Sequence, residues 1–145
     1  MKSEPTSFSI DDLAAVMREP WSGVRNFQAR NFIREMKSGD QALFHHSSTD
    51  PIGVAGIMRI CSDPYPDPTQ YDPGSPYFDP KATKIKPIWY LVDVCFIKKF
   101  KKFVSLAQIK SDPALRDMLV AQRGSRLSIQ PVSEKHFRLI KKLGA

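Results

Sequence analysis

Two adjacent histidines, His45 and His46, are the residues of this chain best suited to acid–base chemistry. Either one could form a proton-transfer couple with Glu4 or Asp50. Adjacent side chains on a β-strand point to opposite faces, however, so the two rings cannot easily share a metal ion. We therefore expect a structural or ligand-contacting role for these histidines rather than a catalytic one.

Other catalytic and cofactor-binding patterns are absent. The sequence contains no GxGxxG, GxxxxGK[ST], GxSxG or HExxH motif. Cys61 and Cys95, the only cysteines, lie in apolar runs and outside any Cys-x-x-Cys or Cys/His cluster, which argues against a zinc site. We expect two buried thiols and neither a cofactor nor a metal. Because no signal peptide or long apolar run is present, we expect no membrane association and a reducing, cytoplasmic setting (nuclear in a eukaryote).

Basic residues are concentrated in the second half of the chain. Residues 1–72 carry 7 basic and 10 acidic side chains, whereas residues 73–145 carry 15 basic and 5 acidic ones, for a net charge of +7. This asymmetry indicates a polyanionic partner for the basic half. The densest run is Lys98, Lys99, Lys101 and Lys102, which fits either a solvated hairpin end or a non-specific grip on a nucleic-acid backbone.

The elements that must position these residues follow from capping and periodicity. Ser9 and Asp12 form a capping box that predicts a helix ending near Met17. Further helices are expected at 28–36, after Ser105 and at 134–142, and strands at 41–46, 52–61, 88–97 and 128–132. The order lacks a regular βα alternation, so we expect one domain, residues 1–145, with an α+β fold around a small curved mixed sheet.

Residues 62–87 differ in composition from the rest. They hold 7 of the 12 prolines and three tyrosines, Tyr65, Tyr71 and Tyr77. Proline removes ladder donors and fixes the backbone, which predicts a long ordered loop rather than sheet. The loop is either a solvent-exposed connector or a stiff support whose tyrosines line the rim of a pocket.

Several short sequence motifs occur in the order that is typical of one family. They are Lys2-Ser-Glu-Pro5, the block from Trp21 to Phe32 (WSGVRNFQARNF), the Pro/Tyr words at 65–73 and 75–79, Trp89-Tyr-Leu-Val-Asp-Val94, and the segment from Arg123 to Val132 (RGSRLSIQPV). Across nearly its whole length the chain resembles the EVE domain family of the PUA-like superfamily, which is related to YTH domains. The resemblance implies a PUA-like pseudobarrel, binding of DNA or RNA that contains modified bases, and no enzymatic activity.

Members of the family usually have a few more residues before the Lys-Ser-Glu-Pro word. Here Met1 directly precedes Lys2. We therefore expect a shortened opening strand and a less rigid placement of Ser3 and Glu4.

A reader of modified bases must hold a base that has left the helical stack, and such a base needs a flat surface. Trp21 is the first candidate, because it lies between Pro20 and Ser22-Gly23 in a loop joining two helices. An ordinary packing role is its alternative. Ser3, Glu4, Asn26 and Ser125 are the candidates for contacts to the base edge or sugar. Rim positions are expected from His45, His46, Tyr65, Tyr71, Tyr77 and Trp89, although Trp89 also fits a core position.

Four arginines, Arg25, Arg30, Arg123 and Arg126, have the fork geometry that suits phosphate, although each could equally form a structural ion pair. The favoured hypothesis is a monomeric, non-enzymatic reader of a modified base such as methylated or hydroxymethylated cytosine. The alternatives are an RNA- or tRNA-binding accessory protein of PUA-like type, an enzyme acting on a nucleoside or small anion, and a protein-interaction module.

Overall fold

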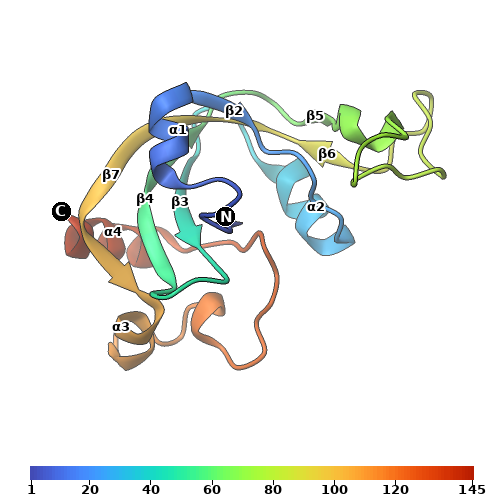
Figure 1. Ribbon diagram of the computed structural model, residues 1–145. Helices are drawn as coiled ribbons and strands as arrows, with labels where there is room; N and C mark the ends of the chain where they lie inside the picture. Colours follow the sequence, from blue (N-terminus) through green and yellow to red (C-terminus); the bar gives the residue numbers. More distant parts are fainter.

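A five-stranded sheet curls around the centre of the computed structural model, which describes residues 1–145 (Figure 1). Its strands follow the order β1-β3-β4-β7-β2. Their bounds are β1 (Lys2–Ser3), β2 (Arg18–Pro20), β3 (Gln41–His46), β4 (Gly53–Ile60) and β7 (Asp93–Ser105). The β1–β3 pair is parallel and the other pairs are antiparallel, so the predicted curved, mixed sheet is confirmed.

Strands β3 and β4 contain consecutive buried residues, so both of their faces are covered, whereas β7 has exposed positions. Successive residues alternate between faces, so Leu43 and Phe44 of β3 enter different core clusters. The Phe44 cluster includes residues of α1 (Ile10–Val16) and α2 (Phe27–Glu35). The Leu43 cluster includes residues of α3 (Leu106–Ser111) and α4 (Glu134–Gly144). Helices therefore cover both sides of the curled sheet.

Short polar caps begin the helices as the sequence predicts. The capping box of Ser9 and Asp12 is present at α1, and Ser105 and Ser133 cap α3 and α4. Each cap supplies an acceptor for a backbone N–H that the first helical turn leaves unpaired. Two short 3-10 helices complete the set, η1 (Pro68–Tyr71) and η2 (Leu119–Ala121). No helix combines the length and the apolar character needed to cross a bilayer.

Two predicted strands differ in the structure. The segment 88–97 divides into β6 (Tyr90–Leu91), which pairs with β5 (Tyr65–Pro66), and the start of β7. Strand β7 then continues to Ser105, so the lysine run lies within a strand and not at a hairpin end. Residues 128–132 form no strand, because only one backbone bond, from Lys2 N to Ser128 O, ties this segment to β1.

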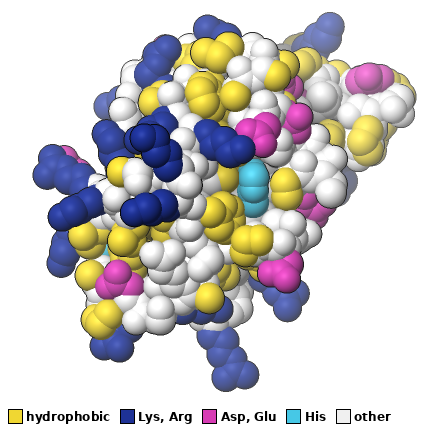
Figure 2. All heavy atoms as spheres, turned by 60° about the vertical axis from the view of Figure 1, so that its left-hand side comes forward, with side chains coloured by type: hydrophobic (Ala, Val, Ile, Leu, Met, Phe, Trp, Pro, Cys, Tyr) yellow, Lys and Arg dark blue, Asp and Glu magenta, His cyan; other side chains and the backbone are white.

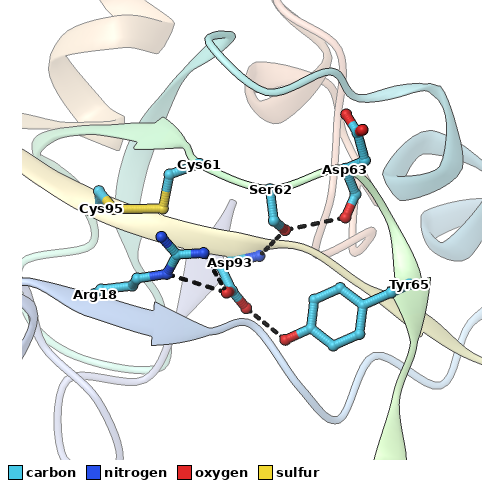
Figure 3. The surroundings of a disulfide bond; sticks show 7 residues. All are labelled: Arg18, Cys61, Ser62, Asp63, Tyr65, Asp93 and Cys95. Atoms are coloured by element: carbon cyan, nitrogen blue, oxygen red, sulfur yellow. Dashed lines mark hydrogen bonds and ion pairs between the residues drawn. A yellow bond between two sulfur atoms is a disulfide. The ribbon is translucent and has the colours of Figure 1, made fainter.

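The prediction of two free, buried thiols was wrong. Cys61 and Cys95 are half-buried and joined in a disulfide with a Cα–Cα distance of 6.0 Å. The bond links the residue after β4 to β7, at the base of the segment 62–92, which we call the arm (Figure 3). Beside it, the Asp93 carboxylate accepts hydrogen bonds from Tyr65 Oη at 2.5 Å and Arg18 Nη2 at 2.8 Å. Tyr65 therefore fastens the arm to the sheet.

Removing the disulfide should weaken the fold measurably. A crosslink over a sequence separation of 34 residues is expected to contribute about 4 kcal/mol through restriction of the unfolded chain. The double variant Cys61→Ser/Cys95→Ser should lower the urea midpoint, and reductant should lower the wild-type midpoint to a similar value without affecting the variant. Maleimide labelling of two thiols in unfolded, unreduced wild type would contradict the bond.

His45 is buried without a hydrogen-bond partner at either ring nitrogen. It lies in a cavity of about 40 Å³ together with Met1 and Lys2. Burial, followed by the nearby positive charges of the Met1 amino group and Lys2, lowers the pKa of His45 to about 4. The ring is therefore neutral at physiological pH, and protonating it in the folded state costs free energy of folding.

Stability should fall as the pH drops from about 6.5 to about 4. Across that window the unfolded chain protonates His45 and the folded chain does not, so each pH unit costs the fold up to about 1.4 kcal/mol. Thermal unfolding of wild type and His45→Leu across this window measures the effect. The variant should lose this part of the slope, while the contribution of the buried Met1 amino group, whose pKa is about 5, remains. Equal slopes would show that His45 titrates normally.

Candidate functional site

A cavity of about 550 Å³ opens between the N-terminal segment and the loop after β2. Its aromatic walls come from Phe8, Trp21 and the arm residue Tyr77. Polar groups surround them: Lys2, Ser3, Glu4, Ser7, Glu19, Ser22, Arg25 and Ser128. We call this space the aromatic cavity. It brings together Ser3, Glu4, Trp21, Arg25 and Tyr77 of the residues singled out in the sequence.

Trp21 belongs both to the core and to the cavity wall. Its side chain is 8 % exposed and meets Phe44 edge-to-face with ring centroids 5.5 Å apart. The Trp21 N–H donates to Val92 O at 2.9 Å, which extends the pairing of β2 by one residue. Core packing and cavity lining are thus two roles of one ring.

The first strand supplies the opposite, polar wall. Ser3 Oγ donates to Phe8 O at 2.6 Å, and the Glu4 carbonyl accepts from the N–H groups of Ser7 and Phe8. These bonds form a turn that fixes the backbone of Glu4. Its exposed side chain forms no hydrogen bond or ion pair, so the carboxylate is free to accept a hydrogen bond from a ligand.

A buried carboxylate, Asp67, joins the arm to the loop after β2. It is fully buried and accepts hydrogen bonds from Gly23 N at 2.8 Å and Arg25 Nη1 at 3.1 Å. It also accepts from Thr69 N at 2.9 Å and Thr69 Oγ1 at 2.6 Å. Burial alone would raise the pKa of Asp67, but these bonds outweigh it and hold the pKa below its ordinary value.

Arg25 and Gly23, which are both bound to Asp67, also contact Tyr77 and fix its position. Arg25 Nη2 donates to Tyr77 O at 2.8 Å, so its guanidinium is engaged within the protein rather than free for phosphate. Gly23 has φ of 85° and packs against the Tyr77 ring, where a Cβ would lie 2.7 Å from Cζ. Both the backbone conformation and the close approach favour glycine here. Asp67 was not among the predicted site residues, because it is one of four aspartates in the proline-rich loop and no local pattern separates it from the others.

The other predicted site residues lie outside the aromatic cavity. Asn26 caps α2 through Ala29 N, and Ser125 accepts from Gln130 Nε2. Arg30 donates to Ile88 O, and Trp89 stacks on Phe27 and donates to Asp79. Tyr65 binds Asp93, and His46 accepts from Ile10 N. The remaining residues outside the cavity are His45, Tyr71, Arg123 and Arg126. Ser128 does line it, at a position expected to be strand.

The lysine run lies outside the aromatic cavity. Lys98, Lys99, Lys101 and Lys102 belong to β7 and none lines the aromatic cavity. Lys99 pairs with Asp11 at 2.8 Å. Figure 2 shows Lys and Arg side chains gathering on the face that includes β7. This surface is suited to non-specific contact with a polyanion.

The curled mixed sheet, its helices and the cavity beside the first strand define a protein of the PUA-like pseudobarrel class. The EVE domain model matches residues 1–143, and the chain belongs to this family. Human thymocyte nuclear protein 1 is 41 % identical over 97 % of this chain and 70 % of its own length.

Solved structures agree with this assignment. A crystal structure of a Pseudomonas syringae protein aligns with a TM-score of 0.95 and 45 % identity, covering 100 % of this chain and 97 % of that one. Human THYN1 in complex with DNA containing 5-methylcytosine aligns with a TM-score of 0.92 and 40 % identity, covering 99 % and 95 % of the two chains. The family and the fold expected from the sequence are thereby confirmed.

Replacing Asp67 should destabilise the protein far more than replacing an exposed acid. Asp67→Ala leaves the Arg25 guanidinium, which is 21 % exposed, and the Gly23 N–H without their partner, at an expected cost of about 3 kcal/mol. The matched control Glu134→Ala breaks the exposed pair with Arg138 and should cost less than about 0.5 kcal/mol. Urea denaturation compares the two, and similar losses would refute the role assigned to Asp67.

Proposed function

We propose that this chain binds DNA containing a modified cytosine, such as 5-methylcytosine, and holds the flipped-out base in the aromatic cavity. The human relative that was crystallised with 5-methylcytosine DNA shares 40 % identity over nearly the whole chain. The observation in this structure that carries the proposal is the cavity itself, in which Trp21 lies near an unpaired Glu4 carboxylate. Its volume of about 550 Å³ is within the range of small-molecule sites.

Each group of the cavity has a chemical task in this proposal. The Trp21 ring supplies a flat apolar surface, and stacking contributes roughly 1–3 kcal/mol per base. Glu4 accepts a hydrogen bond from the 4-amino group of cytosine, which is the donor by which carboxylates recognise this base. Tyr77, held by Arg25 and Gly23, closes the side toward the arm. The proposal involves binding without catalysis, and the two acid–base candidates of the sequence, His45 and His46, do not line the cavity.

Discrimination of a simple methyl group should be modest. One buried methyl contributes about 0.8 kcal/mol, which corresponds to about fourfold in affinity. Stronger selectivity, as for a hydroxymethyl group, requires a hydrogen bond to the modification, because unpaired buried polar groups cost more. The hydroxyls of Ser7, Ser22 and Ser128 line the cavity and could provide it.

Binding should depend on both Trp21 and Glu4. Fluorescence anisotropy at fixed salt would compare matched DNA and RNA oligonucleotides carrying cytosine, 5-methylcytosine or 5-hydroxymethylcytosine. Trp21→Ala should weaken binding to the preferred ligand by roughly 5- to 150-fold, the loss of one stacked base. Because Trp21 also packs in the core, folding is checked by circular dichroism, and Trp21→Phe should restore part of the affinity.

Glu4→Ala provides the test that is independent of the core. It should weaken binding of cytosine derivatives by at least about tenfold, since hydrogen bonds to charged groups contribute about 1.5–3 kcal/mol. Glu35→Ala, an exposed acid of α2 outside the cavity, removes the same charge and should not weaken binding. Unchanged affinity in Glu4→Ala and Trp21→Ala would exclude this cavity as the base site. Tighter binding to every RNA than to its DNA counterpart would favour the RNA-accessory alternative.

A further inference from the structure

A second hollow, of about 500 Å³, lies between α3, η2 and the loop that follows η2. Four basic residues line it: Lys110 of α3, Arg116 of the next turn, and Arg123 and Arg126 of the loop. No acidic residue lines it. We call it the basic hollow.

The charges around the basic hollow are not compensated within the protein. All four residues are exposed, and none of their side chains forms an ion pair or a hydrogen bond. Asp112 and Asp117 are near in sequence but do not line the hollow; Asp112 accepts from Ala114 N, and Asp117 Oδ1 lies 3.1 Å from His136 Nε2. Gathering like charges around a concavity raises the local potential, which an anion in the hollow would relieve.

The loop also presents backbone donors. The N–H groups of Arg123, Gly124 and Arg126 form no hydrogen bond within the protein, whereas Ser125 N donates to Gln122 O. Gly124 has φ of 75°, and a Cβ there would meet nothing within 4 Å. Free N–H groups beside uncompensated guanidinium groups are a combination that suits phosphate oxygens.

The basic hollow and the aromatic cavity are neighbours along one loop. Ser125 lines the hollow, and Ser128, three residues later, lines the cavity. Lys2 lines the cavity and its Nζ approaches Ser125 O at 3.4 Å, which ties the two sites together. Three residues of extended chain span at most about 11 Å, roughly the rise of three base pairs along the axis of B-DNA.

We propose that the basic hollow binds the phosphates of the DNA strand that carries the recognised base, within about three nucleotides of that base. This inference rests on the proposed function. It assigns the backbone grip to Lys110, Arg116, Arg123 and Arg126 rather than to the lysine run of β7. Lys110 and Arg116 lie outside the sequence motifs that the chain shares with the family.

The test compares two double variants of equal charge change. Lys110→Ala/Arg116→Ala removes two cations from the hollow, and Lys135→Ala/Lys141→Ala removes two from the exposed surface of α4. Binding of unmodified and 5-methylcytosine DNA is measured at several salt concentrations. The hollow variant should reduce the slope of log affinity against log salt by about 2 and leave the ratio between the two DNAs unchanged. The α4 variant should leave both unchanged.

Each outcome separates the two proposals. Equal slopes in the two variants, or a larger loss in the α4 variant, would overturn the hollow as the phosphate site even if 5-methylcytosine is preferred. Absence of any preference for modified DNA in wild type would count against the base-reading function, while the slope comparison would still decide the hollow. Lys110→Arg should keep the wild-type slope.

Discussion

The buried carboxylate of Asp67 is the interaction on which the candidate site depends. It lies in the arm, yet it binds Gly23 N and Arg25 Nη1 of the loop after β2. A charge placed where no water can reach it is tolerated only when its lone pairs are satisfied, and the bonds to Asp67 meet that condition. Through them the arm, Tyr77 and the Trp21 loop adopt one arrangement. Elsewhere the arm is held at its base by Tyr65 and the disulfide, and along its length by the bond from Arg30 to Ile88 O and the stacking of Trp89 on Phe27.

Two uses of positive charge are separated in this fold. Arg25 and Arg18 are bound by carboxylates and act as internal fasteners. The cations of the basic hollow and most of the lysine run have no such partners. The basic residues behind the net charge of +7 are therefore not equally available to a ligand. Lys and Arg side chains without an ion-pair partner are free to bind an external anion. Their positions, more than their number, determine how a polyanion would lie on the surface.

Local signals predicted local features, and the rest required tertiary contacts. The capping box at Ser9, the caps at Ser105 and Ser133 and the strand 41–46 were found because each depends on a few adjacent residues. Strand β2 was missed because it is three residues long, ends in Pro20 at the sheet edge, and pairs with residues far along the chain. The disulfide was missed for the same reason, since two cysteines 34 residues apart become neighbours only through the β4–β7 pairing. Asp67 and Ser128 lie in segments shared with the family, but no local pattern marked Asp67 as a buried anchor, and Ser128 was expected in a strand. Trp21 was found from its position in a loop between two helices, with the family resemblance in support.

The double role of Trp21 has a consequence for how ligand choice could change over evolution. Its ring is wedged edge-on against Phe44, and its backbone is hydrogen-bonded to Val92, so the wall of the cavity is as stiff as the interior behind it. Changing the position or size of the Trp21 ring to fit another ligand would disturb the packing of the core. The rim is different, because Glu4, Ser7 and Ser22 are exposed and contribute little to the core. If the cavity binds a base, changes of specificity would therefore come from substitutions at the exposed rim residues, while the Trp21 wall stays constant.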